Sequence, residues 1–337
     1  MDGLLNALVL LANFVLIPAT AYGAQLALGA LGVTLVYAVL RFSNFAHGDL
    51  MAFGTAMVVL VTWGLQGAGI GIAPLPTALL ALPVGILAAI ALSLVTDRLV
   101  FRFYRRQRSA PVVMVMASVG VMFVYNALVR FVIGADDRRF EDGARFVVRV
   151  ADFRAWSGLS EGLAIRTSQL VTVGVMILVT AALFWFLQRT RTGKAMRAFS
   201  DNEDLALLSG ISPERVVLIT WVLAAALATI AGTLYGLDKS FRPFTYFQLL
   251  LPVFASAIVG GIGSPLGAVA GGFVIAFSEV TLTYAWKGVL TWLLPEGAAP
   301  SGLVQLLGTD YKFAVSFIIL VAVLLIRPTG LFRGRVV

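Results

Sequence analysis

The chain contains no cysteine, a single histidine and few charged side chains. Without cysteine it can form no disulfide, no thiolate metal site and no cysteine nucleophile. The histidine, His47, has one nearby carboxylate, Asp49, which is fewer than the three protein ligands of a catalytic zinc site. No G-x-x-x-x-G-K-[ST] stretch occurs, so the sequence lacks a phosphate-binding loop. We therefore expect no metal, nucleotide or other cofactor.

The sequence is rich in apolar residues. The 337 residues are 60% hydrophobic and 12% charged, with a mean hydropathy of +0.95, which leaves too few polar side chains to cover a water-soluble globule. Lipid offers the backbone no hydrogen-bond partners, and the apolar runs are continuous rather than alternating, so we expect an all-α integral membrane protein. The net charge of +8 does not indicate nucleic acid, because the basic residues lie beside apolar runs, where anionic membrane lipids explain them.

A helix needs about 20 apolar residues to cross the hydrocarbon of a membrane. On this basis residues 1–337 form a single transmembrane domain, a polytopic helix bundle of about eight to ten transmembrane helices with broken or re-entrant segments. A further, shorter helix is predicted over residues 3–17. The predicted spans are 19–40, 50–66, 76–97, 111–131, 168–188, 216–236, 248–262, 266–284 and 311–327.

The charges between these spans predict their orientation. Three arginine-rich stretches, 97–108, 189–197 and 327–335, are expected in the cytoplasm under the positive-inside rule. The segments 132–167 and 285–310 have few unbalanced positive charges and are expected outside. Nine spans would put the N-terminus outside and the C-terminus inside, and a tenth span at the N-terminal end would move the N-terminus inside.

Two polar breaks interrupt the apolar pattern. The stretch RFSNFAHGDLMAFG at 41–54 separates two spans, and VGGIGSPLG at 259–267 separates two short apolar segments in the second half of the chain. Non-helical backbone at membrane depth is tolerated beside a cavity, so paired breaks indicate a translocation path, and we expect them to face each other across it. The candidate path residues are Ser43, Asn44, His47, Asp49, Gly260, Gly261, Gly263, Ser264 and Glu279.

The first break also has simpler explanations. Ser43, Asn44 and Gly48 would form a tight cytoplasmic turn if Asp49 caps the next helix, and His47 would then be a packing residue. A hydrolytic Ser-His-Asp set is not favoured, because these residues lie four and two positions apart on a broken helix with no separate oxyanion loop. An ion-coupled carrier or channel would need carboxylates within the membrane, and Glu279 is the one clear example inside a predicted span.

A cytoplasmic stretch, GKAMRAFSDNEDLALLSGISPERV, predicts a short amphipathic helix, a stop at a glycine and a new span that begins with Ser-Pro. At Asp204, Ala206 and Gly210 its spacing is similar to E-A-A-x-x-x-G, the loop by which ABC importer permeases contact their ATPase. Asp replaces the usual Glu, and Leu205 replaces the first Ala. The predicted coupling segment is 193–215, and its candidate ATPase-coupling residues are Arg197, Asp204, Ala206 and Gly210.

Read in order, four stretches between residues 28 and 330 resemble the permease of branched-chain amino acid ABC transporters, the LivH type. They are ALGVTLVYAVLRFSNFAHGDLMAFG, RTRTGKAMRAFSDNEDLALLSGISPERV, AIVGGIGSPLGAVAGGFVIAFSE and YKFAVSFIILVAVLLIRPTG. The resemblance implies the ABC importer permease fold in a bacterial cytoplasmic (inner) membrane. It also implies three kinds of partner: a second homologous permease subunit, two cytoplasmic ATPase subunits and an external substrate-binding protein.

The resemblance implies alternating-access transport of branched-chain amino acids or similar small polar solutes, with no bond made or broken and hence no enzyme activity. Two alternatives stay open from the residues. One is an ABC permease for urea, amides or simple sugars, and the other, of a different class, is an ion-coupled secondary transporter or channel.

Overall fold

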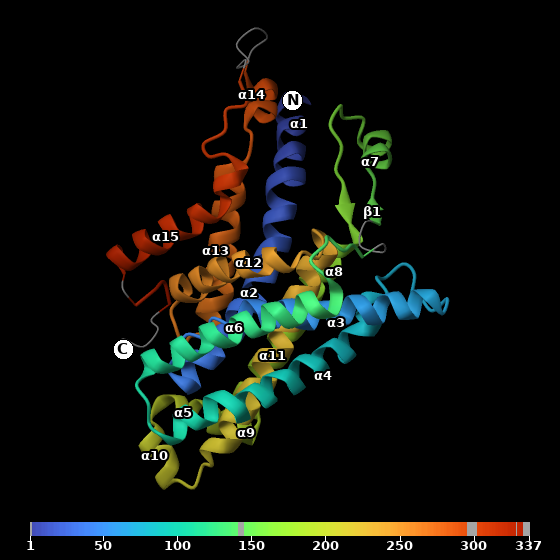
Figure 1. Cartoon of the computed structure of the whole chain (residues 1–337). Helices are drawn as coiled ribbons and strands as arrows, with labels where there is room; N and C mark the ends of the chain where they lie inside the picture. Colours follow the sequence, from blue (N-terminus) through green and yellow to red (C-terminus); the bar gives the residue numbers. More distant parts are fainter. Residues whose placement is uncertain (1, 141–144, 295–301, 328, 333–337) are drawn as a thin grey trace.

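The computed structural model describes residues 2–140, 145–294, 302–327 and 329–332. Within them the chain is almost entirely helical (Figure 1). The first half contains α1 (Asp2–Leu11), a π-helical turn (Ala12–Leu16), α2 (Ile17–Leu40), α3 (His47–Gly67), α4 (Ala78–Thr96), a second π-helical turn (Asp97–Phe101), α5 (Arg102–Arg106), α6 (Pro111–Ile133), β1 (Phe146–Val148), α7 (Val150–Ser157) and β2 (Ile165–Arg166). The second half contains α8 (Thr167–Arg189), α9 (Arg191–Asp201), α10 (Glu203–Leu208), α11 (Pro213–Asp238), α12 (Pro243–Gly260), α13 (Pro265–Thr283), α14 (Lys287–Leu293), a 3-10 turn (Thr309–Tyr311) and α15 (Lys312–Ile326).

Eight helices of the described part are long and apolar enough to cross a membrane, which confirms a polytopic all-α membrane protein. They are Asp2–Leu40, His47–Gly67, Ala78–Arg106, Pro111–Ile133, Thr167–Arg189, Pro213–Asp238, Pro243–Gly260 and Pro265–Thr283. The predicted ninth span coincides with α15, an apolar helix of 15 residues. At 1.5 Å per residue α15 is about 22 Å long, so it is shorter than a straight span of the hydrocarbon.

The predicted short helix at 3–17 adds no crossing of its own. It continues through the π-helical turn into the first span without leaving the helical path, so residues 2–40 form one helix of 39 residues. A ten-span arrangement with a separate N-terminal crossing is therefore wrong. At 1.5 Å per residue this helix is about 58 Å long, close to twice the ~30 Å of hydrocarbon.

The helix α2 is the centre of the bundle, and nearly all of its residues from Ala19 to Val36 are buried. It packs most extensively against α13 and α11, and also against α8 and α12. Small residues allow this close approach: a Cβ added at Gly272 would lie 2.6 Å from the backbone nitrogen of Ala27.

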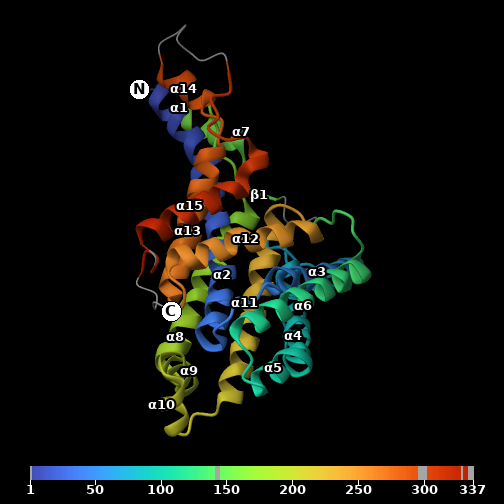
Figure 2. The same ribbon diagram turned by 60° about the vertical axis from the view of Figure 1, so that its left-hand side comes forward.

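The two ends of the molecule differ in structure (Figures 1 and 2). At one end α1 packs against α14, and β1 pairs with β2 beside α7, which forms a lobe outside the bundle. The Asn6 and Asn13 side chains of the long helix accept hydrogen bonds from the backbone of Glu161 (2.9 Å) and Ala164 (3.1 Å). We call this end the lobe end. At the opposite end lie α5, α9 and α10, which we call the coupling end.

Candidate functional site

The first predicted break is a re-entrant segment inside the bundle. α2 ends at Leu40, Arg41 adopts a left-handed conformation (φ 58°), and α3 begins only at His47. His47 lies beside Gly32, where an added Cβ would be 2.6 Å from the ring carbon Cε1. Gly32 is eight residues before the end of α2. The non-helical stretch therefore runs back along α2 by about 12 Å before α3 begins.

Each polar residue of this break has a definite neighbour. The Asn44 side chain accepts a hydrogen bond from the backbone of Ala46 (3.1 Å), which makes a local turn. Asp49 does not cap α3, whose N-cap residue is Ala46; instead its carboxylate accepts a hydrogen bond from Asn126 of α6 (2.8 Å). Ser43 is half-buried, whereas Asn44, His47 and Asp49 are buried. Asn44 therefore makes a local turn, but Gly48 lies inside α3 and the proposed Asp49 cap was wrong. Whether the break lines a path or is a packing turn stays a prediction.

Two of these buried groups keep unused hydrogen-bonding atoms. The oxygen Oδ2 of Asp49 has no hydrogen-bond partner among the described residues, and the His47 ring has none there beyond a poorly aligned contact with the backbone of Gly29. His47 makes no hydrogen bond to Asp49 or to a serine within that set, so the residues do not form a hydrolytic triad. Unused polar atoms are rare in a packed interior. Both side chains are fully buried, and a role for them in binding a solute stays a prediction.

The second predicted break is a tight turn between α12 and α13. Gly261 (φ 111°) and Gly263 (φ 85°) adopt conformations that favour glycine. The hydroxyl of Ser264 caps α13 by accepting a hydrogen bond from the backbone of Gly267 (3.2 Å). A Cβ added at Gly260 would lie 2.0 Å from the Gly267 carbonyl oxygen, so the two helices cross with backbones in contact.

The structure does not bring the two breaks into direct contact among the described residues. Gly48 packs against the Tyr246 carbonyl, and the Phe45 ring lies 5.3 Å from the Phe254 ring, so the first break lies along the first two-thirds of α12. The second break lies at the end of that helix, six residues or about 9 Å beyond Phe254. That the breaks face each other across a path stays a prediction.

The second break lies near the coupling end of the molecule. Gly263 lines a cavity of about 400 Å³ together with Lys194 and Arg197 of α9 and the end of α2. The chain after α15 returns to the same place: the backbone of Leu331 donates to Val259 (2.8 Å), and that of Phe332 to Gly260 (3.0 Å).

Glu279 lies in a buried charged cluster away from both breaks. Its carboxylate is 3.7 Å from the Lys312 ammonium and accepts a hydrogen bond from the Ser316 hydroxyl. The same ammonium lies 3.8 Å from the centre of the Tyr22 ring. The cluster joins α13 to α15 and α2, so Glu279 is paired with a cation of its own chain.

The predicted coupling segment folds as two short helices and a turn. Thr190 caps α9 and Asn202 caps α10, each by accepting a backbone hydrogen bond with its side chain. Gly210 ends the pair in a left-handed conformation (φ 78°), and α11 starts at Pro213. The predicted short helix, glycine stop and new span are all confirmed.

Exposure separates the four predicted coupling residues. Arg197, Asp204 and Gly210 are exposed, but Ala206 is 3% exposed and faces inward, on the side of α10 that packs against α9. The outward face of α10 carries Leu205 and Leu208, which are 61% and 85% exposed. Large apolar side chains at positions i and i+3 of a short helix form a small apolar surface with no partner in the described chain.

Comparison with known proteins shows to which family the chain belongs. A family model described as "Branched-chain amino acid transport system / permease component" matches residues 16–324. The chain belongs to this family. Branched-chain amino acid permeases named LivH, from Salmonella typhimurium and from Escherichia coli K12, are each 30% identical over 323 residues, which covers 93% of this chain and 92% of theirs. The BraD permease of Pseudomonas aeruginosa is 29% identical over 316 residues, with the same coverage.

The protein is thus the permease subunit of an ABC importer and a multi-pass protein of the inner membrane. This confirms the sequence-based family and function. Family membership also means that the permease works with partner subunits of a transport system.

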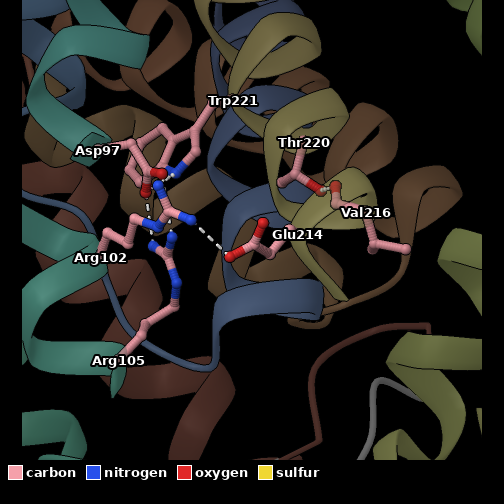
Figure 3. A network of polar contacts seen from close by, with 7 residues as sticks. All are labelled: Asp97, Arg102, Arg105, Glu214, Val216, Thr220 and Trp221. Atoms are coloured by element: carbon pink, nitrogen blue, oxygen red, sulfur yellow. Dashed lines mark hydrogen bonds and ion pairs between the residues drawn. The ribbon is translucent and has the colours of Figure 1, made fainter. Parts of the chain in front are cut away.

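One network that the sequence did not reveal ties the permease's coupling segment to its bundle (Figure 3). The Asp97 carboxylate accepts hydrogen bonds from both terminal nitrogens of Arg105 (2.5 and 3.0 Å) and from the indole of Trp221 (2.7 Å). Beside it Arg102 pairs with Glu214 in the first turn of α11 (2.7 Å). In the sequence analysis the arginines of 97–108 served only to predict orientation. The acidic Asp97 at the start of this arginine-rich stretch was the signal that could have indicated such a network.

Proposed function

We propose that this permease imports branched-chain amino acids or closely similar small polar solutes, as its relatives' names indicate. In the proposed complex it pairs with a second homologous permease, two cytoplasmic ATPase subunits drive it, and an external binding protein delivers the solute. It makes and breaks no covalent bond. Alternating access would follow from ATPase closure that moves the coupling segment and, with it, the helices around the path.

The exposed leucine pair of α10 is the observation that supports the proposed contact with the ATPase subunits. Leu205 and Leu208 lie on a helix that is capped at its start and fixed by Gly210 at its end. An apolar face held rigidly at the end of a transport subunit suits a groove on a cytoplasmic protein. Ala206 lies on the opposite side, where its small size lets α10 lie close to α9.

The same end is proposed to be cytoplasmic. The positive-inside rule assigns the arginine-rich stretches to the cytoplasm, and several contacts support one common side for them. Arg41 donates to the Ser200 carbonyl of α9 (2.6 Å), and Arg102 pairs with Glu214 just after α10. The pairing of Leu331 and Phe332 with the α12–α13 turn, beside α9, supports a cytoplasmic C-terminus.

The re-entrant segment at 41–46 and the start of α3 are the proposed solute path. A zwitterionic amino acid carries an ammonium group and a carboxylate. Asp49, which faces Asn126 of α6, would offer an acceptor for the first, and the His47 ring, which faces Gly32 of α2, would offer a donor for the second. The uncharged Asn44 would line the path near its entrance to the turn. The path would open by a shift of α3 against α12, along the Gly48–Tyr246 contact.

The test is uptake of radiolabelled leucine by the complete transporter in vesicles, with its binding protein outside. Leu208→Asp should release the ATPase subunits and abolish uptake, because a carboxylate would be buried in the partner's groove. The matched control is Leu303→Asp, which changes a leucine that is 64% exposed at the lobe end and should leave the ATPases attached.

Normal uptake and normal ATPase attachment in Leu208→Asp would refute this docking surface. Solute identity is tested by competition in the unmodified transporter: excess valine or isoleucine should block leucine uptake, whereas urea, acetamide and ribose should not. Leucine uptake that requires a proton or sodium gradient but no ATP would refute the importer mechanism in favour of a carrier.

A further inference from the structure

A basic cavity opens at the coupling end, apart from the proposed path and from the exposed face of α10. It measures about 420 Å³, within the range of roughly 300–1,000 Å³ typical of small-molecule sites. Its walls come from the end of α2, from α5, from the start of α6 and from the segments around α10 and α11. Its charged lining consists of Arg41, Arg102, Arg105, Arg106, Arg108, Glu203 and Glu214.

Three of the five arginines already have acceptors in the protein. Arg105 is held by both oxygens of Asp97, Arg102 by Glu214 and Arg41 by the Ser200 carbonyl (Figure 3 shows the first two). These contacts also neutralise Glu214. By contrast, no hydrogen bond or ion pair joins Arg106 or Arg108 to any residue for which the structure gives a position.

Two exposed arginines without a hydrogen-bonded or ion-paired partner in the described part of the chain therefore line the cavity, and Arg106 is also near enough to Glu214 to interact with it electrostatically. The other acid of the lining is Glu203. The first turn of α6, a helix of 23 residues that starts at Pro111, lines the same cavity. Its backbone N–H groups and the helix dipole favour an anion there, in addition to the arginines. The electrostatics of the site select a ligand with negative charge.

The other part of the lining is apolar. Val39, Leu40, Met114 and Val217 face the cavity from three different helices. Next to it, a smaller cavity of about 140 Å³ shares Arg102, Arg105 and Glu214 and is also lined by aliphatic side chains, namely Leu94 and Leu218.

Exposed apolar side chains also lie close in sequence to the arginines of the cavity. Leu99, Phe103 and Val112 are 74%, 55% and 63% exposed, next to the arginines in the sequence. Their positions at the ends of two membrane spans suit contact with acyl chains. A ligand that matches both halves has a phosphate-sized anionic head and an apolar tail.

We propose that this cavity binds an anionic phospholipid, with its phosphate between Arg106 and Arg108 at the start of α6 and its acyl chains along Leu99, Phe103 and Val112. Basic pockets between spans at the cytoplasmic side are a recognised form of anionic lipid site. The assignment rests on the proposed orientation, in which the coupling end faces the cytoplasmic leaflet. Bound there, the lipid joins the α5–α6 turn to the part of the bundle from which α11 begins.

The test uses the complete transporter in phosphatidylcholine vesicles that contain a trace of photoactivatable phosphatidylglycerol. Cross-links should map by mass spectrometry to residues 99–114, and unlabelled phosphatidylglycerol should compete for them. In the double variant Arg106→Gln/Arg108→Gln the competing lipid should bind about 30-fold more weakly, because each lost surface charge weakens binding roughly fivefold. The matched control is Arg189→Gln/Arg191→Gln, which removes two exposed arginines outside the cavity and should compete as the unmodified protein does.

Equal weakening in the control would overturn the proposal, because the attraction would then be a general property of the basic surface. Protection by inorganic phosphate alone, to the same extent as by the lipid, would overturn it in favour of a free anion. Unchanged cross-linking together with loss of the ATPase subunits in Arg106→Gln/Arg108→Gln would overturn it in favour of a protein contact. Labelling of Ser109→Cys from outside the cell would show that the orientation, not the chemistry of the cavity, was at fault.

Discussion

Removal of one charge from the Glu279–Lys312 pair should destabilise the permease more than removal of both. Lys312→Met leaves a carboxylate that is 0% exposed without its cation, whereas Glu279→Gln leaves an ammonium whose side chain is 27% exposed. The double variant Glu279→Gln/Lys312→Met leaves no charge behind. Met is similar to Lys in length, and the Gln carbonyl can still accept the hydrogen bond from Ser316.

The burial of each partner sets the expected order of the free energies of unfolding. Loss of one member of a buried ion pair costs about 3–5 kcal/mol, because the remaining charge is uncompensated, whereas replacement of both is often close to neutral. Lys312→Met should lie near the upper value, since it also removes the cation–π contact with Tyr22. Glu279→Gln should lie near the lower value, because a partly exposed lysine can extend its ammonium toward water.

The measurement is reversible unfolding of the purified permease in mixed detergent micelles, with the free energy of unfolding obtained for all four proteins. The coupling energy of this double-mutant cycle should be at least about 2 kcal/mol. If each single variant unfolds within about 1 kcal/mol of the unmodified protein, or if the double variant is destabilised by the sum of the two, the pair does not stabilise the fold as described.

Three further predictions concern orientation, path and coupling. Ser109→Cys should resist an impermeant thiol reagent added to intact cells, whereas Ser157→Cys in the lobe should react; equal labelling would refute the orientation. Asn44→Leu and Gly261→Val should each reduce leucine uptake several-fold while the ATPases still co-purify, the first by loss of a polar wall and the second by strain at φ 111°; normal uptake in both would mean that the breaks are packing turns. Ala206→Arg should lower the thermal stability of the isolated permease, because the site is 3% exposed; unchanged stability with lost ATPase binding would place this residue in the partner contact instead.

The helices could be read from the sequence because each span is a long apolar run with a turn signal at its end. Gly210 and the Ser-Pro pair after it, for example, end α10 and start α11 where the sequence predicts. The predicted gap between the segments 3–17 and 19–40, at Pro18, is absent from the structure. The structure accommodates the proline in the first turn of α2, just after a π-helical turn, and the helix continues.

The candidate site was predictable in its location but not in its contacts. Glycines and polar residues marked both breaks, because they are unusual between apolar runs. The partner of Asp49 is Asn126, which lies 77 residues away on another helix, and no periodic pattern links the two. Likewise, no pattern in the sequence predicts that Ala206 faces inward and Leu208 outward, because the apolar face of so short a helix can cover its own bundle or a partner.

The unbroken helix of residues 2–40 has a mechanical consequence for transport. Its first turns are held in the lobe through Asn6 and Asn13, and at its other end Arg41 is bonded to α9. A rigid rod of about 58 Å that tilts by about 5° around its middle displaces both ends by roughly 2.5 Å in opposite directions. The lobe and α9 are therefore attached to the two ends of one continuous helix. In the proposed mechanism a shift of the lobe would reach the coupling segment through this helix, with the π-helical turn at Ala12–Leu16 as the place where it can bend.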